Sequence, residues 1–476
     1  MAGLLFRAIK SAILFAYGLF TMFAYAFIQI RNGNFFRKSS EKEKLELYLA
    51  RERFWNLSND WAGLSHQFLT LRNGFKFHLV CNDRPNSGPN TKPLVIFIHG
   101  FPDSWAIWRH IIRSSAIQSA ATVVAIDLPG YGGSDSLGKY SATNVLEKLT
   151  EFVVTIRALY GIDGDGEAEQ RRVVIVGHDW GCVLAMRLAA EAPQLADRFI
   201  LTNGPLPGLV ISNVRRLVSS SVKMFKTALR SPLSSRSILF KAMKSMKPVL
   251  RQLTRSGYIA AMQLPMTFVR YLGSGGNYSF LRATHRISYG RTEFTIVDAA
   301  ECMASSLGPS AEECKTRTKD NEQYPASVKK ERVFGNFDHM AGYYRHGAAT
   351  SRWRKSIETI ASLHSIARGN EFRRSSSGAG LFDDGPEGVL KGNSTVIWGK
   401  EDIALEPPLC LDGISDYLVH NSQVILLPRS GHFTPMERES RVALEKAVEW
   451  AVKGEREDIG AVIQACYPKA TVTIRK

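Results

Sequence analysis

A carboxylate stands at the centre of a sharp turn in this chain. Residues 177–181 read Gly-His-Asp-Trp-Gly; they follow the apolar run 173–176 and precede a helix-like stretch, 182–188. A strand, a tight turn and a helix, with small residues two before and two after the central residue, describe a nucleophile elbow. The central residue is Asp179 rather than serine. A carboxylate displaces at an sp3 carbon and leaves an alkyl ester on the protein, so it suits strained or activated carbons such as those of epoxides and haloalkanes.

A second loop supplies the groups that such a nucleophile needs. Residues 99–102 read His-Gly-Phe-Pro and follow the apolar strand predicted over 93–98. In proteins with a nucleophile elbow, an oxyanion hole is formed by two backbone N–H groups: one from such a loop and one from the residue after the nucleophile. We therefore expect the two donors to be the N–H groups of Phe101 and Trp180.

The late part of the chain carries an acid and a histidine in the matching order. Asp402 follows a predicted strand, with Glu401 as its runner-up, and His432 follows the next strand, 423–428. Nucleophile, acid and histidine in this sequence order are typical of α/β-hydrolases. The acid would hold the imidazole in one tautomer while the imidazole takes a proton from water. An alternative acid position, after an earlier strand, is occupied by Asn203, which favours Asp402.

With these motifs the chain resembles the epoxide hydrolases of the α/β-hydrolase superfamily, and most of all the membrane-anchored ones. The resemblance implies two cap tyrosines that hydrogen-bond the epoxide oxygen. One precedes a glutamine by five residues in that family, which points to Tyr258, and the other precedes an arginine, which points to Tyr344 with Tyr343 as runner-up. A phenol can donate a hydrogen bond or a proton to the alkoxide that ring opening creates. The other possibility is that these tyrosines only line an apolar wall.

The predicted reaction has two steps and needs neither a metal nor an organic cofactor. Asp179 attacks an epoxide carbon to form an ester, and water activated by His432 and Asp402 then releases a diol. The expected partners are a small lipophilic epoxide and water. Two alternatives stay open: a haloalkane or haloacid dehalogenase, which shares the Asp nucleophile but does not need Tyr258, and a non-catalytic, membrane-tethered lipid-binding protein on the same fold.

The sequence divides into four regions. We expect an anchor and linker over residues 1–60, the first hydrolase half over 61–205, a helical cap with insertions over 206–390, and the second hydrolase half over 391–476. Strands that alternate with helical stretches predict a mostly parallel sheet flanked by helices, the α/β-hydrolase fold. A polar Gly/Ser-rich loop near residues 373–386 is predicted within the cap.

An apolar run near the N-terminus predicts a membrane helix. Residues 11–30 contain no charge, and a helix of this length matches a hydrocarbon core of about 30 Å. The small-x-small pattern at 24–26 allows a cleaved signal peptide instead, but the apolar run continues past it, which favours an uncleaved single-pass anchor. Arg31, Arg37 and Lys38 follow the run, so we expect the catalytic domain in the cytosol, at the endoplasmic reticulum membrane.

The positive charge is concentrated in the cap. The chain has a formal net charge of +17, and residues 199–292 contain fifteen Lys and Arg but no Asp or Glu. Apolar and basic residues alternate there with helical spacing, and a second amphipathic segment is expected to end at Pro248. This pattern fits a solvated basic face, or contact with an anionic membrane surface that would let substrate enter from the bilayer. No nucleic-acid-binding motif accompanies the charge, so we expect no nucleic-acid partner.

Overall fold

The architecture was obtained as a computed structural model of the chain. The structure describes residues 2–84, 91–163, 171–230, 236–331, 337–374 and 386–474. Most of the predicted Gly/Ser-rich loop near 373–386 lies outside the described residues.

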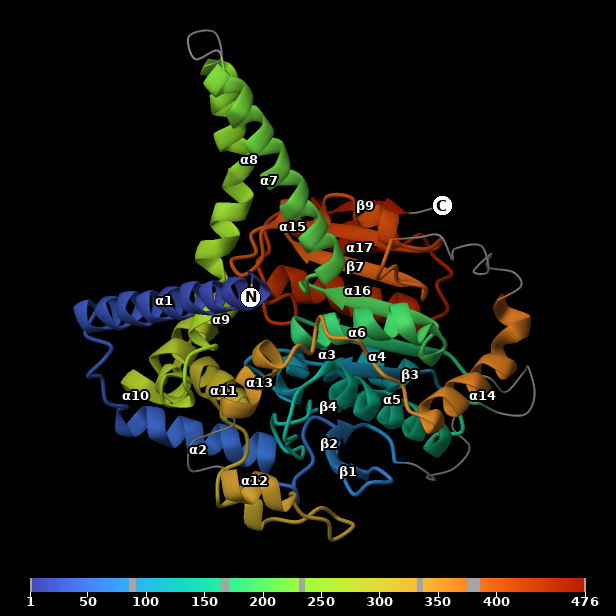
Figure 1. Cartoon of the computed structure of the whole chain (residues 1–476). Helices are drawn as coiled ribbons and strands as arrows, with labels where there is room; N and C mark the ends of the chain where they lie inside the picture. The colour runs from blue at the N-terminus through green and yellow to red at the C-terminus, as the bar shows by residue number, and fades with distance from the viewer. Residues whose placement is uncertain are drawn as a thin grey trace.

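A single mixed sheet forms the centre of the described part (Figure 1). Its strands follow the order β1-β2-β4-β3-β5-β6-β7-β8-β9; the neighbours from β4 to β8 are parallel, and β1, β2 and β9 are joined antiparallel at the edges. The parallel strands are continuous apolar runs because both faces of the sheet are covered. The strands are β1 (Ser65–Thr70), β2 (Lys76–Cys81), β3 (Leu94–Ile98), β4 (Thr122–Ile126), β5 (Val173–His178), β6 (Arg198–Thr202), β7 (Ser394–Gly399), β8 (Gln423–Leu427) and β9 (Thr471–Ile474).

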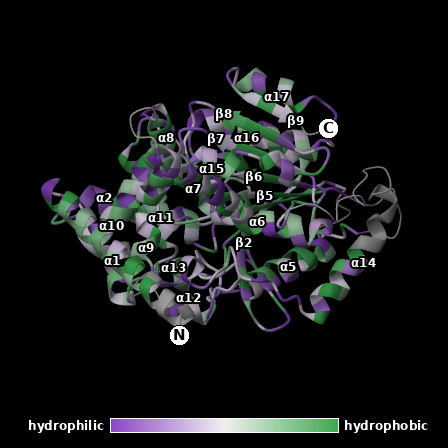
Figure 2. Cartoon of the chain, turned by 45° about the horizontal axis from the view of Figure 1, so that its top comes forward, coloured by the Kyte–Doolittle hydropathy of each residue, from purple (hydrophilic) through white to green (hydrophobic). Residues whose placement is uncertain are grey.

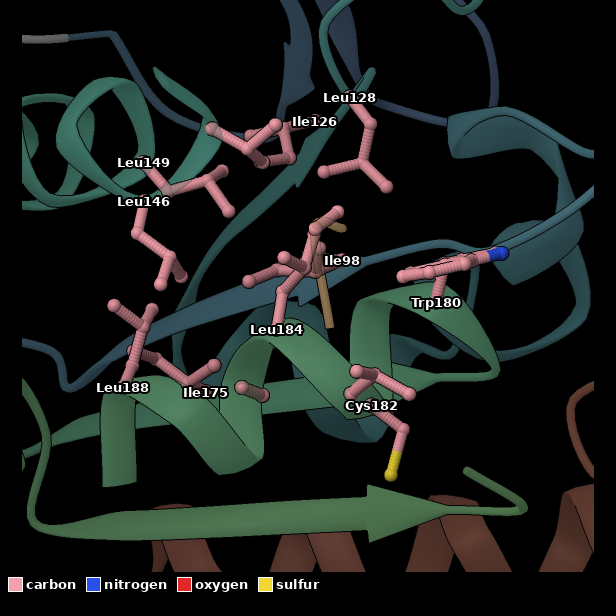
Figure 3. Packing of buried hydrophobic residues seen from close by; sticks show 14 of the residues in the cluster. Ile98, Ile126, Leu128, Leu146, Leu149, Ile175, Trp180, Cys182, Leu184 and Leu188 are labelled. Atoms are coloured by element: carbon pink, nitrogen blue, oxygen red, sulfur yellow. The ribbon is translucent and has the colours of Figure 1, made fainter. Parts of the chain in front are cut away.

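Helices cover the two faces of the sheet and bury two apolar clusters. One face packs on α5 (Ala142–Leu159) and α6 (Trp180–Glu191). Figure 3 shows Ile98 and Ile175, from neighbouring strands, against Leu184 and Leu188 of α6. The opposite face packs on α2 (Glu41–Trp55), α3 (Arg109–Ile112), α4 (Ser115–Ala120), α16 (Arg438–Val452) and α17 (Ile459–Cys466). Since every parallel strand ends at the same edge of this double-sided core, the loops that follow the strands are held close together.

The cap is inserted between β6 and β7. Two long helices, α7 (Pro207–Arg230) and α8 (Arg236–Arg255), pair with each other and project from the body (Figure 1). The prediction that the second amphipathic segment ends at Pro248 is wrong: α8 continues to Arg255, because a proline removes only one main-chain hydrogen bond and kinks a helix without always ending it. The remaining cap helices are α9 (Gly257–Ala261), α10 (Met266–Ser288), α11 (Ile296–Leu307), α12 (Ala326–Glu331), α13 (Phe337–Arg345) and α14 (Ile357–Arg374); a short α15 (Pro407–Leu411) follows β7.

The N-terminal helix α1 (Ala2–Arg31) packs along the cap on α9 and α10. The Tyr17 hydroxyl donates to the carbonyl of Leu253, and Tyr25 shares a hydrogen bond of 2.8 Å with Ser279. The segment Ser11–Arg31 is long and apolar enough to cross a membrane, with a mean hydropathy of 1.8, and most of it is not buried against the protein. In Figure 2 hydrophobic residues concentrate on the central strands, whereas hydrophobic and hydrophilic residues alternate on the cap helices.

Candidate active site

Asp179 occupies the strained turn between β5 and α6. Its φ of 51° lies in the left-handed region, which a non-glycine residue adopts only when its surroundings enforce it. The flanking glycines are needed because the chain passes so closely: a Cβ on Gly177 would lie 2.5 Å from the carbonyl oxygen of Gly181, and one on Gly181 would lie 2.0 Å from that of Ile98. The turn therefore presents the Asp179 side chain at the carboxyl edge of the sheet, as the elbow pattern predicts.

The loop after β3 holds one oxygen of this carboxylate. The backbone N–H of Phe101 donates to Asp179 Oδ1 at 2.7 Å. Trp180 is the first residue of α6, and the first N–H groups of a helix have no partner within it. The two residues predicted to form an oxyanion hole thus flank the Asp179 carboxylate.

The predicted acid and histidine meet at the same edge of the sheet. Nδ1 of His432 lies 2.8 Å from Asp402 Oδ2, and Nε2 lies 3.5 Å from Asp179 Oδ2. Because a carboxylate can only accept, Nδ1 carries the hydrogen, and Nε2 faces the nucleophile. Asp402 is buried, and its Oδ1 accepts from the backbone N–H groups of Ala404 and Leu405 at 2.8 and 2.9 Å. The structure therefore brings Asp179, His432 and Asp402 into one row, in which His432 is hydrogen-bonded to Asp402 and its Nε2 faces Asp179.

Asn203, which the order of motifs marks only as a position without an acid, lies against Asp402 and orients it. It follows β6, has a φ of 43°, and donates from Nδ2 to Asp402 Oδ2 at 2.7 Å. Its Oδ1 accepts from the Thr434 hydroxyl at 2.6 Å and from the Gly399 N–H at 3.2 Å, so its amide orientation is fixed. The pairing of β6 with β7 puts the two strand ends side by side, and that adjacency is the signal that could have revealed the contact.

The charges around His432 favour its protonated form. Burial disfavours the imidazolium, but Asp402 and Asp179 outweigh this and raise the pKa of His432 to about 10. With both carboxylates ionised, His432 holds its proton at neutral pH. Loss of the Asp179 charge would remove one of the two causes of the raised pKa.

The two cap tyrosines converge on the carboxylate from α9 and α13. The rings of Tyr258 and Tyr344 lie 5.8 Å apart, and each packs near Phe101, at 6.5 and 5.6 Å between ring centroids. Tyr344 also meets Trp180 edge to face at 4.9 Å. Burial, with added repulsion from Asp179, raises the pKa of both phenols, so they remain protonated donors.

The runner-up, Tyr343, is engaged elsewhere. Its ring is buried, and its hydroxyl donates to the carbonyl of Pro129 at 2.9 Å. It packs between Tyr131 and Tyr140 rather than presenting its hydroxyl to the carboxylate. The two adjacent tyrosines therefore contact different parts of the protein, whereas the sequence could only rank them as candidates.

The runner-up acid also faces away from the row. The Glu401 side chain is about half exposed and pairs with Arg291 at 2.8 Å on the surface. Over the part of the chain that the structure describes, no cluster of three or more His, Cys, Asp or Glu side chains forms a metal site.

Comparison with known proteins gives matches to part of the chain. A family model described as the alpha/beta hydrolase fold matches residues 93–252. Mouse epoxide hydrolase 4 is 32% identical over 159 residues, which cover 33% of this chain and 40% of that protein, and mouse epoxide hydrolase 3 is 32% identical over 148 residues, which cover 29% and 36%. A crystal structure of the Bacillus megaterium epoxide hydrolase superposes with a TM-score of 0.45 at 22% identity, covering 81% of this chain and 99% of that one.

The chain therefore has the α/β-hydrolase fold, as predicted. The resemblance to epoxide hydrolases is confirmed at the level of sequence, over a stretch that spans about two fifths of the length of the two mouse relatives.

Proposed function

We propose that this chain hydrolyses lipophilic epoxides to vicinal diols through an ester on Asp179. The observation that carries the proposal is the convergence of two cap phenols, Tyr258 and Tyr344, on a carboxylate nucleophile that also faces a histidine. An epoxide places its carbon against a nucleophile and its oxygen against an acid at the same time. The sequence similarity to proteins named epoxide hydrolases supports the same reaction.

In the first step Asp179 Oδ2 attacks one epoxide carbon. A new C–O bond forms, the ring C–O bond breaks, and the developing alkoxide takes a proton from Tyr258 or Tyr344. The backbone N–H of Phe101 keeps the other carboxylate oxygen in place. The product of this step is a neutral hydroxyalkyl ester.

In the second step His432 acts on water. Ester formation removes the negative charge of Asp179, so the pKa of His432 falls, and the proton on Nε2 can leave for the tyrosinate formed in the first step. Neutral His432 then takes a proton from water, and the hydroxide attacks the ester carbonyl. The N–H groups of Phe101 and Trp180 stabilise the tetrahedral oxyanion. When the ester C–O bond breaks, the departing alkoxide takes a proton from His432 and leaves as the diol, and the new Asp179 carboxylic acid returns its proton to His432.

A labelling experiment tests the route. In a single turnover in heavy-oxygen water, the label should enter the Asp179 carboxylate, and the first diol should carry none. In later turnovers the label should reach the diol. Label in the first diol would contradict an ester intermediate and indicate direct attack of water on the epoxide.

The adjacent tyrosines give a matched pair for the acid role. Tyr344→Phe and Tyr258→Phe should each slow epoxide turnover by about 10²-fold, the lower end of the range for an acid in the transition state. Tyr343→Phe removes the hydroxyl that bonds to the carbonyl of Pro129, so it should cost about 1 kcal/mol of stability and leave turnover within a few fold. A dehalogenase would be favoured if the wild type turned over no epoxide but released halide from a haloalkane, and if Tyr258→Phe released halide as well. No activity in either assay would favour a lipid-binding protein.

We further propose that α1 anchors the catalytic domain at the endoplasmic reticulum, on the cytosolic side. The support is the apolar length of Ser11–Arg31 and the basic residues that follow it. We expect the protein to stay in the membrane fraction after carbonate extraction. In sealed microsomes, added protease should digest the catalytic domain. Extraction into the soluble fraction, or removal of the helix as a signal sequence, would contradict the anchor.

A further inference from the structure

The α7–α8 arm, formed by residues 207–230 and 236–255, projects from the body of the protein (Figure 1). Where its two helices meet, the buried residues are small: Ser221, Ala228 and Ala242 are each less than a tenth exposed, and the Ser221 hydroxyl donates to the carbonyl of Ala242 at 3.1 Å. Small residues let the two backbones approach closely. Many of the large apolar side chains therefore remain outside the contact between the helices.

These large apolar side chains are exposed on the arm. Leu229 is 79% exposed and Phe240 is 69% exposed. An apolar helix face of a water-soluble cap would instead be buried on the body of the domain. Several large exposed apolar side chains on one element are typical of a site of contact with a partner or a membrane. The exposed large apolar residues of the arm are Ile211, Val222, Leu229, Leu239, Phe240, Met243, Leu250 and Leu253.

Unpaired lysines stand beside this apolar surface. Within the described residues five exposed lysines of the arm form no ion pair, and no acidic residue is present on either helix. Apolar side chains alternating with lysines on one helix are typical of segments that lie in the interface of an anionic membrane. Nucleic acid would satisfy the lysines but not the apolar side chains. The five lysines are Lys223, Lys226, Lys241, Lys244 and Lys247.

The base of the arm joins the apolar N-terminal helix to the active site. Leu253 accepts a hydrogen bond from Tyr17 of α1. On the other side Arg255 pairs with Glu406 at 2.9 Å, and Gln252 bonds to the backbone N–H of Glu406 at 2.7 Å and to the carbonyl of Ala404 at 2.9 Å. This is the loop whose N–H groups hold Asp402. The arm is thus fixed between the candidate membrane helix and the acid of the catalytic row.

We propose that the α7–α8 arm is a second membrane-contacting element, selective for anionic lipids. Its apolar side chains lie between the lipid headgroups, and its lysines pair with lipid phosphates and carboxylates. A second copy of the same arm is a poorer occupant, because two surfaces rich in lysine and lacking acids repel each other. The proposal does not depend on which reaction Asp179 performs.

An introduced tryptophan reports on the arm alone. None of the eight native tryptophans falls within residues 2–31 or 207–255. Phe240→Trp in the full chain would be reconstituted into vesicles of brominated phosphatidylcholine, with or without an equal part of phosphatidylserine. Ile357→Trp, at an 81% exposed position on α14, is the matched control on another part of the surface. Epoxide turnover in detergent is measured in parallel.

The added indole at position 240 should be quenched in anionic vesicles and much less in neutral ones, whereas that at 357 should stay unquenched in both. Changing Lys223, Lys226, Lys241 and Lys244 together to Gln should reduce quenching at 240 to the level of the control, with turnover in detergent unchanged. Equal quenching in the two lipids would overturn the selectivity. A lack of quenching in both, or an emission shift that follows protein concentration rather than lipid, would overturn membrane contact and indicate a protein partner.

Discussion

Replacing Asp402 by asparagine should separate the two chemical steps. The wild-type carboxylate accepts four hydrogen bonds: from His432 and Asn203 at Oδ2, and from two backbone N–H groups at Oδ1. An asparagine has only one oxygen. If that oxygen serves the two backbone N–H groups, its NH2 group faces the Nδ2 of Asn203, which is itself a donor. Asn203 cannot turn around, because its own Oδ1 serves Thr434 and Gly399.

Two effects of Asp402→Asn follow from this geometry. One buried donor is left without a partner, which should lower the free energy of unfolding by about 1–3 kcal/mol. The new NH2 also donates to Nδ1 of His432, so the imidazole takes the other tautomer, with its hydrogen on Nε2 facing Asp179. Since that nitrogen can no longer accept a proton from water, ester hydrolysis should slow by about 10²- to 10⁴-fold. Ester formation does not need the base and should continue.

The assay is rapid mixing of the variant with an epoxide, followed by mass spectrometry of the intact protein and of its peptides. We expect a stoichiometric adduct on the peptide that contains Asp179, and diol only at the slow hydrolysis rate. Glu401→Gln is the control, because that neighbouring side chain pairs with Arg291 on the surface. Turnover of Asp402→Asn within threefold of wild type, or loss of turnover without an adduct in a folded protein, would refute the reasoning.

Three further outcomes are expected. The pKa of His432 in the folded protein, about 10, exceeds the usual 6.5. Its contribution to stability is therefore fully present below pH 6.5 and is lost as the pH rises through about 10. The free energy of unfolding measured against pH should show this loss. Asp179→Asn should lower the pKa of His432, as seen by NMR of the imidazole, and an unchanged value would mean that Asp179 does not control it. Gly132→Ala should lower the free energy of unfolding by about 2–4 kcal/mol, because the φ of Gly132 is +46° and the new Cβ would lie 2.1 Å from Asp127. Gly138→Ala is the control: its new Cβ meets nothing within 4 Å, so the free energy of unfolding should change by less than about 0.5 kcal/mol.

The elbow and the individual strands could be predicted because local sequence determines them. A Cβ on Gly177 would meet the carbonyl oxygen of Gly181, four residues further along the chain, and the apolar strands carry their own pattern. The members of the row formed by Asp179, His432 and Asp402 could be predicted from the order of motifs along the chain. The contact of Asn203 with Asp402 was not, because it spans 199 residues and depends on β6 lying beside β7.

The α7–α8 arm shows a different limit. Helical spacing predicts that each helix has an apolar face, but it does not say what that face touches. That depends on which residues of the two helices meet, and here a small pair, Ser221 and Ala242, lies at the contact. Sequence periodicity alone therefore left open whether the apolar side chains were core or surface. The continuation of α8 beyond Pro248 was missed for a related reason, since contacts along the arm and at its base support the helix on both sides of the proline.

The order of the two proposed steps is set by one charge. While Asp179 is ionised, its carboxylate and that of Asp402 keep His432 protonated, and a protonated imidazole cannot accept a proton from water. Activation of water before an ester has formed on Asp179 is therefore disfavoured. Once Asp179 is an ester, only Asp402 still raises the pKa of His432, and the imidazole can give up its proton to the tyrosinate that faces the same site. The base thus becomes available only after the intermediate exists, and Asn203, by fixing Asp402, keeps that control in place through both steps.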